Sequence, residues 1–184
     1  MKKHILKLGL MCLLIVSTLF GQSTVSIPTT TGIVGQDITI PVNSSAIPRV
    51  GSVTLNISFN PKVVTINTAT GISNSPFQTQ GFFNVNTTIV NETTSTLTIG
   101  WFSGTPVAIT DKLMDLTFSY LGGTSGITFT GINEITDDKA QPIATTFTSG
   151  AIAAKPTTLK LGTVVSDPNK SVIVELSATE LKNA

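Results

Sequence analysis

The fold is decided by the stretch SVTLNISF, residues 52–59, in which polar and apolar side chains alternate without a break. Successive side chains of a β-strand point to opposite faces, so this pattern predicts a strand that is buried on one face and exposed on the other. Asn60 and Pro61 end the pattern, because proline has no N–H group to donate within a sheet. Residues 52–59 therefore predict one strand of a sheet that covers an apolar core.

Shorter runs of the same kind lie on both sides of this stretch and are separated by turn-forming residues. They are rich in Val, Ile and Thr, whose β-branched side chains favour strands. No long segment has a helical pattern, and residues 68–81 read as a long connection. We therefore predict an all-β protein with nine strands in two sheets packed face to face. The apolar positions of these strands fall within residues 25–27, 38–42, 53–59, 64–66, 83–85, 97–101, 114–120, 127–129 and 143–147.

Residues 1–21 have the organisation of a secretory signal peptide. Lys2, Lys3 and Lys7 precede an apolar run at 8–20, which is shorter than the about 20 residues that a membrane span needs. We predict cleavage after this segment, and hence a secreted, extracellular protein that has no membrane association once the signal is removed. An uncleaved membrane anchor is the alternative.

Composition restricts the chemistry of the remaining chain. The only Cys and the only His are Cys12 and His4, which lie inside the predicted signal peptide and leave no thiol or imidazole for catalysis, disulfides or metal binding. Charged residues are 11% of the sequence, the net charge is +1, and no block of basic residues would neutralise a row of phosphates. We predict a non-catalytic protein with no metal, no cofactor and no nucleic-acid partner.

The tail after Ala154 repeats the beginning of the domain. Residues 155–158 read as a linker, and an offset of 134 residues then brings six apolar positions into phase. Each copy also has a turn before its second strand, at 35–37 and at 168–170. The matched pairs are Val25 with Leu159, Ile27 with Leu161, Ile38 with Val172, Ile40 with Val174, Val42 with Leu176 and Ile47 with Leu181.

This repeat predicts the domain organisation. We expect one sandwich at 22–154, followed at 155–184 by a linker and the first strands of a truncated second module. The alternative is a C-terminal hairpin added to the first sandwich, because matching alternation is common in β proteins.

Five short motifs, taken in order, resemble the cohesin family. The stretch GQDITIPV at 35–42 is similar to that family's opening strand, and VGS at 50–52 with ISFNPKVV at 57–64 is similar to its third strand and following turn. IGWFS at 99–103 and FTSGAI at 147–152 fit later strands. The turn departs from the family pattern because Asn60 stands where Asp is commoner.

The resemblance covers about residues 24–153, and again 158–183 in the partial copy. It implies a nine-stranded jelly-roll β-sandwich that acts by binding. Cohesins bind dockerin modules carried by polysaccharide-degrading enzymes, and the same fold is shared with a group of carbohydrate-binding modules. A dockerin-like protein module and a polysaccharide are therefore the two expected partners.

The resemblance also implies a binding face, because the family docks dockerin on the sheet of strands 3, 5, 6 and 8. The matching strands present short hydroxyl and amide side chains, which can bond to a protein backbone or to sugar hydroxyls. These positions are neutral, whereas well-studied cohesins carry some carboxylates there. Polar outward residues occur in every sandwich, so a solvated face without a ligand is the alternative. The predicted binding residues are Ser52, Thr54, Asn56, Ser58, Asn84, Asn86, Thr98, Phe102, Thr128 and Thr130.

Two neighbouring aromatic residues have opposite strand phases. Trp101 shares the phase of Leu97 and Ile99, which predicts core packing, whereas Phe102 is predicted to be exposed. A β-bulge near Gly100 would exchange the two. Phenylalanines beside the loose connection read as a satellite core, with a lip over a ligand as the alternative: Phe77, Phe82 and Phe83.

The only acidic cluster consists of Glu134, Asp137 and Asp138. Its spacing lacks the regular loop of a calcium-binding motif, so it predicts a solvated turn, with a calcium site as the alternative. Three classes of function stay open for the chain: a cohesin in a polysaccharide-degrading assembly, a carbohydrate-binding module, and a structural or adhesive repeat of a surface protein.

Overall fold

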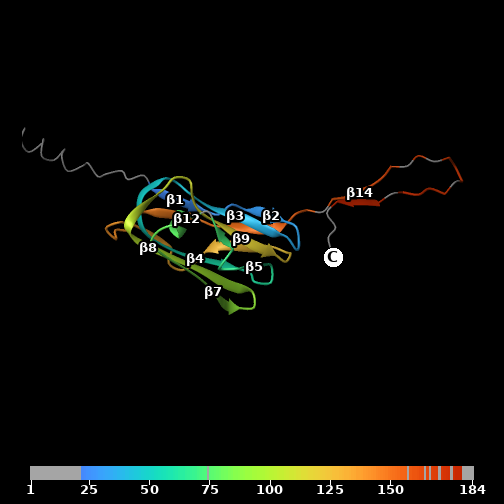
Figure 1. The fold of residues 1–184 in the computed structure, drawn as a ribbon. Helices are drawn as coiled ribbons and strands as arrows, with labels where there is room; N and C mark the ends of the chain where they lie inside the picture. Colours follow the sequence, from blue (N-terminus) through green and yellow to red (C-terminus); the bar gives the residue numbers. More distant parts are fainter. Residues whose placement is uncertain are drawn as a thin grey trace, which may run out of the picture.

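Two β-sheets packed face to face form the body of the molecule, as Figure 1 shows. The computed structural model describes residues 22–73, 75–156, 158–163, 165, 167–169, 171–174 and 176–179. The predicted signal peptide lies outside the described residues. Within them the only helical segment is the single 3₁₀ turn η1 (Pro76–Gln78). The prediction of an all-β jelly-roll sandwich is confirmed.

The strands of each sheet come from distant parts of the chain. The first sheet has the order β12 (Thr145–Thr148), β1 (Ser23–Ser26), β3 (Asp37–Ser44), β9 (Lys112–Tyr120) and β5 (Val64–Ile66), and β6 (Ile72–Ser73) also pairs with β9. The second has the order β2 (Thr30–Gly32), β13 (Gly150–Ala154), β10 (Ser125–Phe129), β4 (Ile47–Phe59), β8 (Thr94–Ile109) and β7 (Phe82–Asn91), and β11 (Glu134–Asp137) also pairs with β4.

The first and last segments of the domain each contribute to both sheets. β1 pairs with β12 in parallel in the first sheet, and β2 pairs with β13 in parallel in the second. Pro28 lies between β1 and β2, where its missing N–H and fixed φ suit a break between strands. The structure therefore adds β2 and β13, which follow the first and last predicted strands, and the short strands β6 and β11, none of which the alternation predicted.

The core lies between the sheets and consists of the apolar phase of each strand. Val53, Leu55 and Ile57 of β4 are at most 1% exposed, as the pattern of residues 52–59 predicts. Burying each such side chain stabilises the fold by about 1.5–3 kcal/mol relative to an exposed position. The connection at 68–81 adds Phe77, whose ring stacks on Trp101 with centroids 4.6 Å apart. Phe77 is therefore buried as predicted, but it belongs to the main core and not to a separate satellite core.

The tail forms a separate two-stranded sheet of β14 (Thr158–Leu161) and β15 (Leu176–Thr179), which pair with each other in antiparallel fashion. In Figure 1 the hairpin extends beyond the sandwich. Within the described residues, neither strand joins either sheet of the sandwich.

Candidate functional site

The outer side of strands β7, β8, β4, β10 and β11 presents the predicted binding residues in rows across the second sheet. We call this surface the outer face. Its register is continuous from Phe102 to Ser95 opposite Ser52 to Phe59, so no bulge at Gly100 reverses the side chains. The rows are Phe82, Phe102, Ser52 and Thr136; Asn84, Gly100, Thr54 and Glu134; Asn86, Thr98 and Asn56; and Thr88, Thr96, Ser58 and Thr128.

Nine of the ten predicted residues lie on these rows, and Thr130 lies beside them. Thr130 follows β10 in the connection to β11, and its backbone N–H donates to the carbonyl of Asn56 over 2.8 Å. The structure thus brings the predicted residues together on one surface. It also shows that they are not equivalent, because some of their polar groups already bond to one another.

Asn56 is the most strongly connected residue of the outer face. Its side-chain amide donates to the carbonyl of Ile132 over 2.6 Å, and its side-chain oxygen accepts from the Thr98 hydroxyl over 2.9 Å. Its backbone N–H donates to the side-chain oxygen of Asn133 over 2.8 Å. Asn56 therefore holds the connection between β10 and β11. The side chains of Asn56 and Thr98, both predicted to bind a ligand, already form hydrogen bonds within the protein.

Two hydroxyls of β4 are also used within the sheet. Ser52 shares a hydrogen bond of 2.8 Å with Thr136, and Ser58 has a weak contact of 3.4 Å to the carbonyl of Thr128. Three other members of the face have side chains with no hydrogen-bond partner among the described residues, so their polar groups remain available to a ligand: Thr54, Asn84 and Asn86.

An exposed aromatic pair occupies one end of the outer face. Phe102 is 61% exposed and Phe82 is 56% exposed, and their rings lie 5.5 Å apart at 33°. Gly81 supports this pair: its φ is +80°, and its backbone lies so close to Phe102 and Trp101 that a Cβ would clash. The exposure of Phe102 is as predicted. The interpretation of Phe82 as satellite core is wrong, because Phe82 lies directly opposite Phe102 on the outward side.

Trp101, next to Phe102, points the other way. It is 2% exposed, and its indole N–H donates to the carbonyl of Gln80 over 2.7 Å. Its predicted place in the core is confirmed. The third phenylalanine near this connection, Phe83, is partly buried against the core.

Gly100 opens a gap in the side-chain cover of the outer face. It stands between Asn84 and Thr54 in its row, and no atom lies within 4 Å of the position that a Cβ would take. Glu134 ends the same row, so the face carries one carboxylate at its margin. Glu134 lies there because β11 pairs with β4. Alternation within a strand does not predict which distant strands pair, so the sequence pattern gave no sign of this position.

The other members of the acidic cluster have structural partners. Asp137 accepts from the backbone N–H groups of Lys139 and Gln141, at 2.8 and 2.9 Å, and thereby shapes the turn after β11. Asp138 forms a two-pronged ion pair with Arg49, and the hydrogen bond from that guanidinium lowers the pKa of Asp138. No group of three metal-ligating side chains occurs among the described residues.

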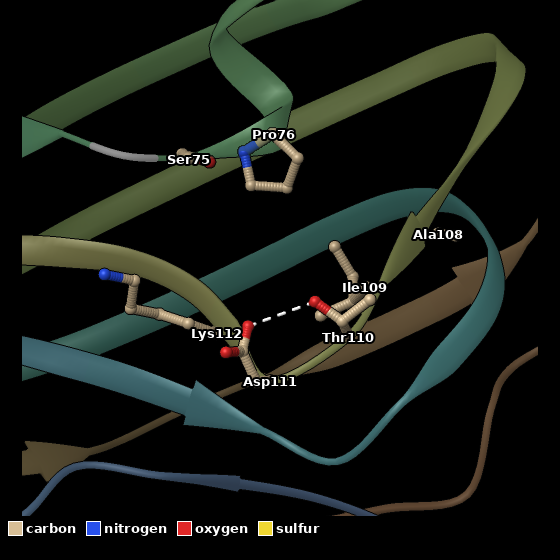
Figure 2. Close-up of a pocket in the computed structure, with 7 residues that line it drawn as sticks. All are labelled: Ser75, Pro76, Ala108, Ile109, Thr110, Asp111 and Lys112. Carbon is tan, nitrogen blue, oxygen red and sulfur yellow. Dashed lines mark hydrogen bonds between the residues drawn. The ribbon is translucent and has the colours of Figure 1, made fainter.

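A shallow hollow of about 360 Å³ lies at the turn between β8 and β9, under η1 (Figure 2). Its lining includes Pro76, Ile109 and Asp111, and Thr110 donates a hydrogen bond to Asp111 over 3.1 Å. None of the ten predicted binding residues lines this hollow. The candidate site is therefore an open, nearly neutral sheet face and not a cavity.

The topology of the two sheets places this chain in the class of jelly-roll β-sandwich modules. The family model of the cohesin domain matches residues 23–154, which is more than half of the chain, and the chain therefore belongs to the cohesin domain family. A search of the curated proteins gave no match.

Solved structures of cohesins share the fold at low sequence identity. A non-cellulosomal cohesin from the archaeon Archaeoglobus fulgidus has a TM-score of 0.58 at 17% identity, covering 74% of this chain and 93% of its own. A cohesin from Clostridium acetobutylicum has a TM-score of 0.60 at 20% identity, with coverages of 72% and 90%. A Clostridium thermocellum cohesin, solved in complex with a dockerin, has a TM-score of 0.61 at 13% identity, with coverages of 73% and 100%.

No helix within the described part of the chain is long and apolar enough to cross a membrane.

Residue by residue, alternation found most of the outer face but missed Phe82 and Glu134. Phe82 has the same phase as Asn84 and Asn86, which is the signal that identifies it as an outward residue.

Proposed function

We propose that this chain is an extracellular, non-catalytic module that binds a dockerin-type protein partner on its outer face. Membership of the cohesin domain family supports the proposal, as do the similar cohesins that were solved in complex with dockerins. The predicted signal peptide at 1–21 supports export. The observation that carries the choice of surface is the exposed pair of Phe82 and Phe102 at the end of a polar sheet face.

The aromatic pair is suited to anchor a partner. Phe side chains bury a large apolar area and have few rotamers to lose, and a few such anchors dominate the binding energy of protein interfaces. The two rings already contact each other, which further restricts the conformations that binding must fix. Contact of a partner with Phe82 and Phe102 thus supplies the apolar centre of the interface.

The polar rows next to the pair supply hydrogen-bonding groups and space for a side chain of the partner. Thr54, Asn84 and Asn86 keep unused donors and acceptors, and Gly100 leaves space among them for a side chain of the partner. Hydroxyl and amide groups lose less hydration energy on burial than charged groups do. Since Glu134 is the one charged side chain in the rows, we expect an affinity that changes little with ionic strength.

The test is binding of residues 22–184 to a panel of dockerin modules with calcium present, measured by calorimetry. We expect Phe102→Ala and Phe82→Ala each to raise Kd about 30-fold, which corresponds to a hot spot of about 2 kcal/mol. Gly100→Val should also weaken binding, because the added side chain fills the gap without strain in the sheet.

The matched control is Ile89→Ala, which removes a 76% exposed apolar side chain from the same strand β7 but from the opposite strand phase. It should leave Kd unchanged. If Ile89→Ala weakens binding as much as Phe102→Ala, or if neither phenylalanine matters for a dockerin that binds, the outer face is not the docking surface.

Polysaccharide is a second candidate ligand, because exposed aromatic rings also stack on sugar rings. The test is retention on insoluble polysaccharides in the absence of any partner protein, again with Phe82→Ala and Phe102→Ala. Retention that both substitutions abolish would favour a carbohydrate-binding module. If the chain binds neither a dockerin nor a polysaccharide, a structural repeat of a surface protein is the better account.

A further inference from the structure

The tail hairpin has the same strand register as the opening strands of the sandwich. In the sandwich, Val25 pairs with Ser44 and Ser26 pairs with Asn43. Adding the offset of 134 to the residue numbers of the first pair gives 159 and 178. These two residues, Leu159 and Ala178, pair with each other in the tail. The same offset aligns the apolar residues of the two segments in the sequence. Shared side-chain phase alone does not dictate a backbone register, so the pairing is a separate observation.

The turns of the two segments also correspond. Gly35 has a φ of +78°, and Asn169, which is 134 residues later, has a φ of +68°. Asn is among the few residues other than Gly that adopt this left-handed conformation at modest cost. A Cβ on Gly35 would have nothing within 4 Å, so the sandwich itself leaves room for such a side chain at this turn.

The two segments differ in burial. Ile38 and Ile40 of β3 are 9% and 1% exposed, whereas the matching Val172 and Val174 are 43% and 44% exposed. Ile27 is 2% exposed and the matching Leu161 is 74% exposed. In the sandwich, β9 pairs along β3 and β12 pairs along β1, and the opposite sheet covers their apolar side. Within the described residues, β14 and β15 have no neighbouring strand other than each other.

We propose that residues 158–179 are the opening hairpin of a second cohesin-type sandwich, and that their open edges and apolar side form the surface that the remaining strands of such a sandwich cover. The occupants are strands with the sequence character of β9, beside β15, and of β12, beside β14. A two-stranded hairpin is marginally stable alone in water, which is consistent with a role as part of a larger sheet.

The test completes the second module on the intact chain. Residue 184 corresponds to residue 50 by the same offset, so residues 51–154 are appended directly after Ala184. We expect the calorimetric enthalpy of unfolding to rise about twofold, because this enthalpy scales with the number of folded residues. Amide hydrogens of 158–161 and 176–179 should also become strongly protected from exchange.

The control is Val174→Asp, at the position that matches the buried Ile40. In the parent chain this substitution should leave unfolding of the first sandwich unchanged, since Val174 is 44% exposed and its strand joins neither sheet of that sandwich. In the extended chain it should remove the added enthalpy and the protection of the hairpin, while the first sandwich unfolds as before.

Two results would overturn the proposal. One is an appended segment that adds no enthalpy while the first sandwich stays folded. The other is an appended segment that folds equally well with Val174→Asp, since the hairpin would then take no part in it. Neither result bears on dockerin binding by the first sandwich, so the two proposals fail independently.

Discussion

The inner and outer sides of strands β4 and β8 have the same backbone and the same register, yet they have different roles. The inner side packs into the core, and the outer side faces solvent. Trp101 and Phe102 are neighbours in the sequence, but Trp101 is 2% exposed and Phe102 is 61% exposed. The inner side is apolar from Val53 to Phe59 and from Leu97 to Trp101, and its effect is on stability. On the outer side, one part is bonded into the fold and another is available to a ligand. Exposure alone therefore does not identify a binding residue.

The largest effect is expected for truncation on the inner side. Trp101→Ala removes the partner of Phe77 and the hydrogen bond to Gln80, and leaves a cavity, so we expect a loss of about 3–5 kcal/mol in the free energy of unfolding. Phe102→Ala should cost at most about 1 kcal/mol, because only the contact with Phe82 is lost. Denaturant unfolding of both variants measures the difference. Similar losses for the two would contradict the separation of inner and outer roles.

Local alternation was sufficient to predict this separation. The phase of residues 52–59 and 97–102 determines which side chains face the core, because neither strand contains a bulge there. The same reasoning predicted the sandwich, whereas the resemblance to cohesins indicated which strands share the outer face. The nine-strand count was too low, because β2, β6, β11 and β13 are short strands without a long run of alternation.

Long-range pairing was not predictable from alternation. Glu134 reaches the outer face because β11 pairs with β4, and Asn56 is bonded to Thr98, Ile132 and Asn133 from two other strands or connections. The sequence identified Asn56 as a polar outward residue and therefore as a ligand-binding candidate. It contained no signal that the same amide groups hold the connection between β10 and β11.

An intermediate effect is expected at Asn56 for this reason. Asn56→Ala removes the bonds to the Ile132 carbonyl and the Thr98 hydroxyl, and we expect a loss of about 1–3 kcal/mol in the free energy of unfolding. Amide exchange in residues 130–133 should accelerate at the same time. The comparison is Thr54→Ala, two residues away on the same face, which makes no such bonds and should cost less than about 1 kcal/mol. Equal losses for Asn56 and Thr54 would show that the network does not stabilise the fold.

The smallest effect is expected at the rim, where the exposed side chain of Arg49 pairs with the half-buried carboxylate of Asp138. The guanidinium lowers the pKa of Asp138, so the pair stabilises the folded state above the unfolded pKa of about 3.9, and this contribution disappears as the pH falls through the lower folded value. We expect Asp138→Asn to lower Tm slightly at pH 6, and we expect this difference to shrink as the pH falls below about 3.9. Arg49→Gln should produce the same pattern, and the double variant should add nothing further, because either substitution alone removes the pair. A Tm difference that does not shrink as the pH falls below about 3.9 would mean that Asp138 acts through its backbone turn and not through its charge, since an ion pair contributes little once one partner is neutral.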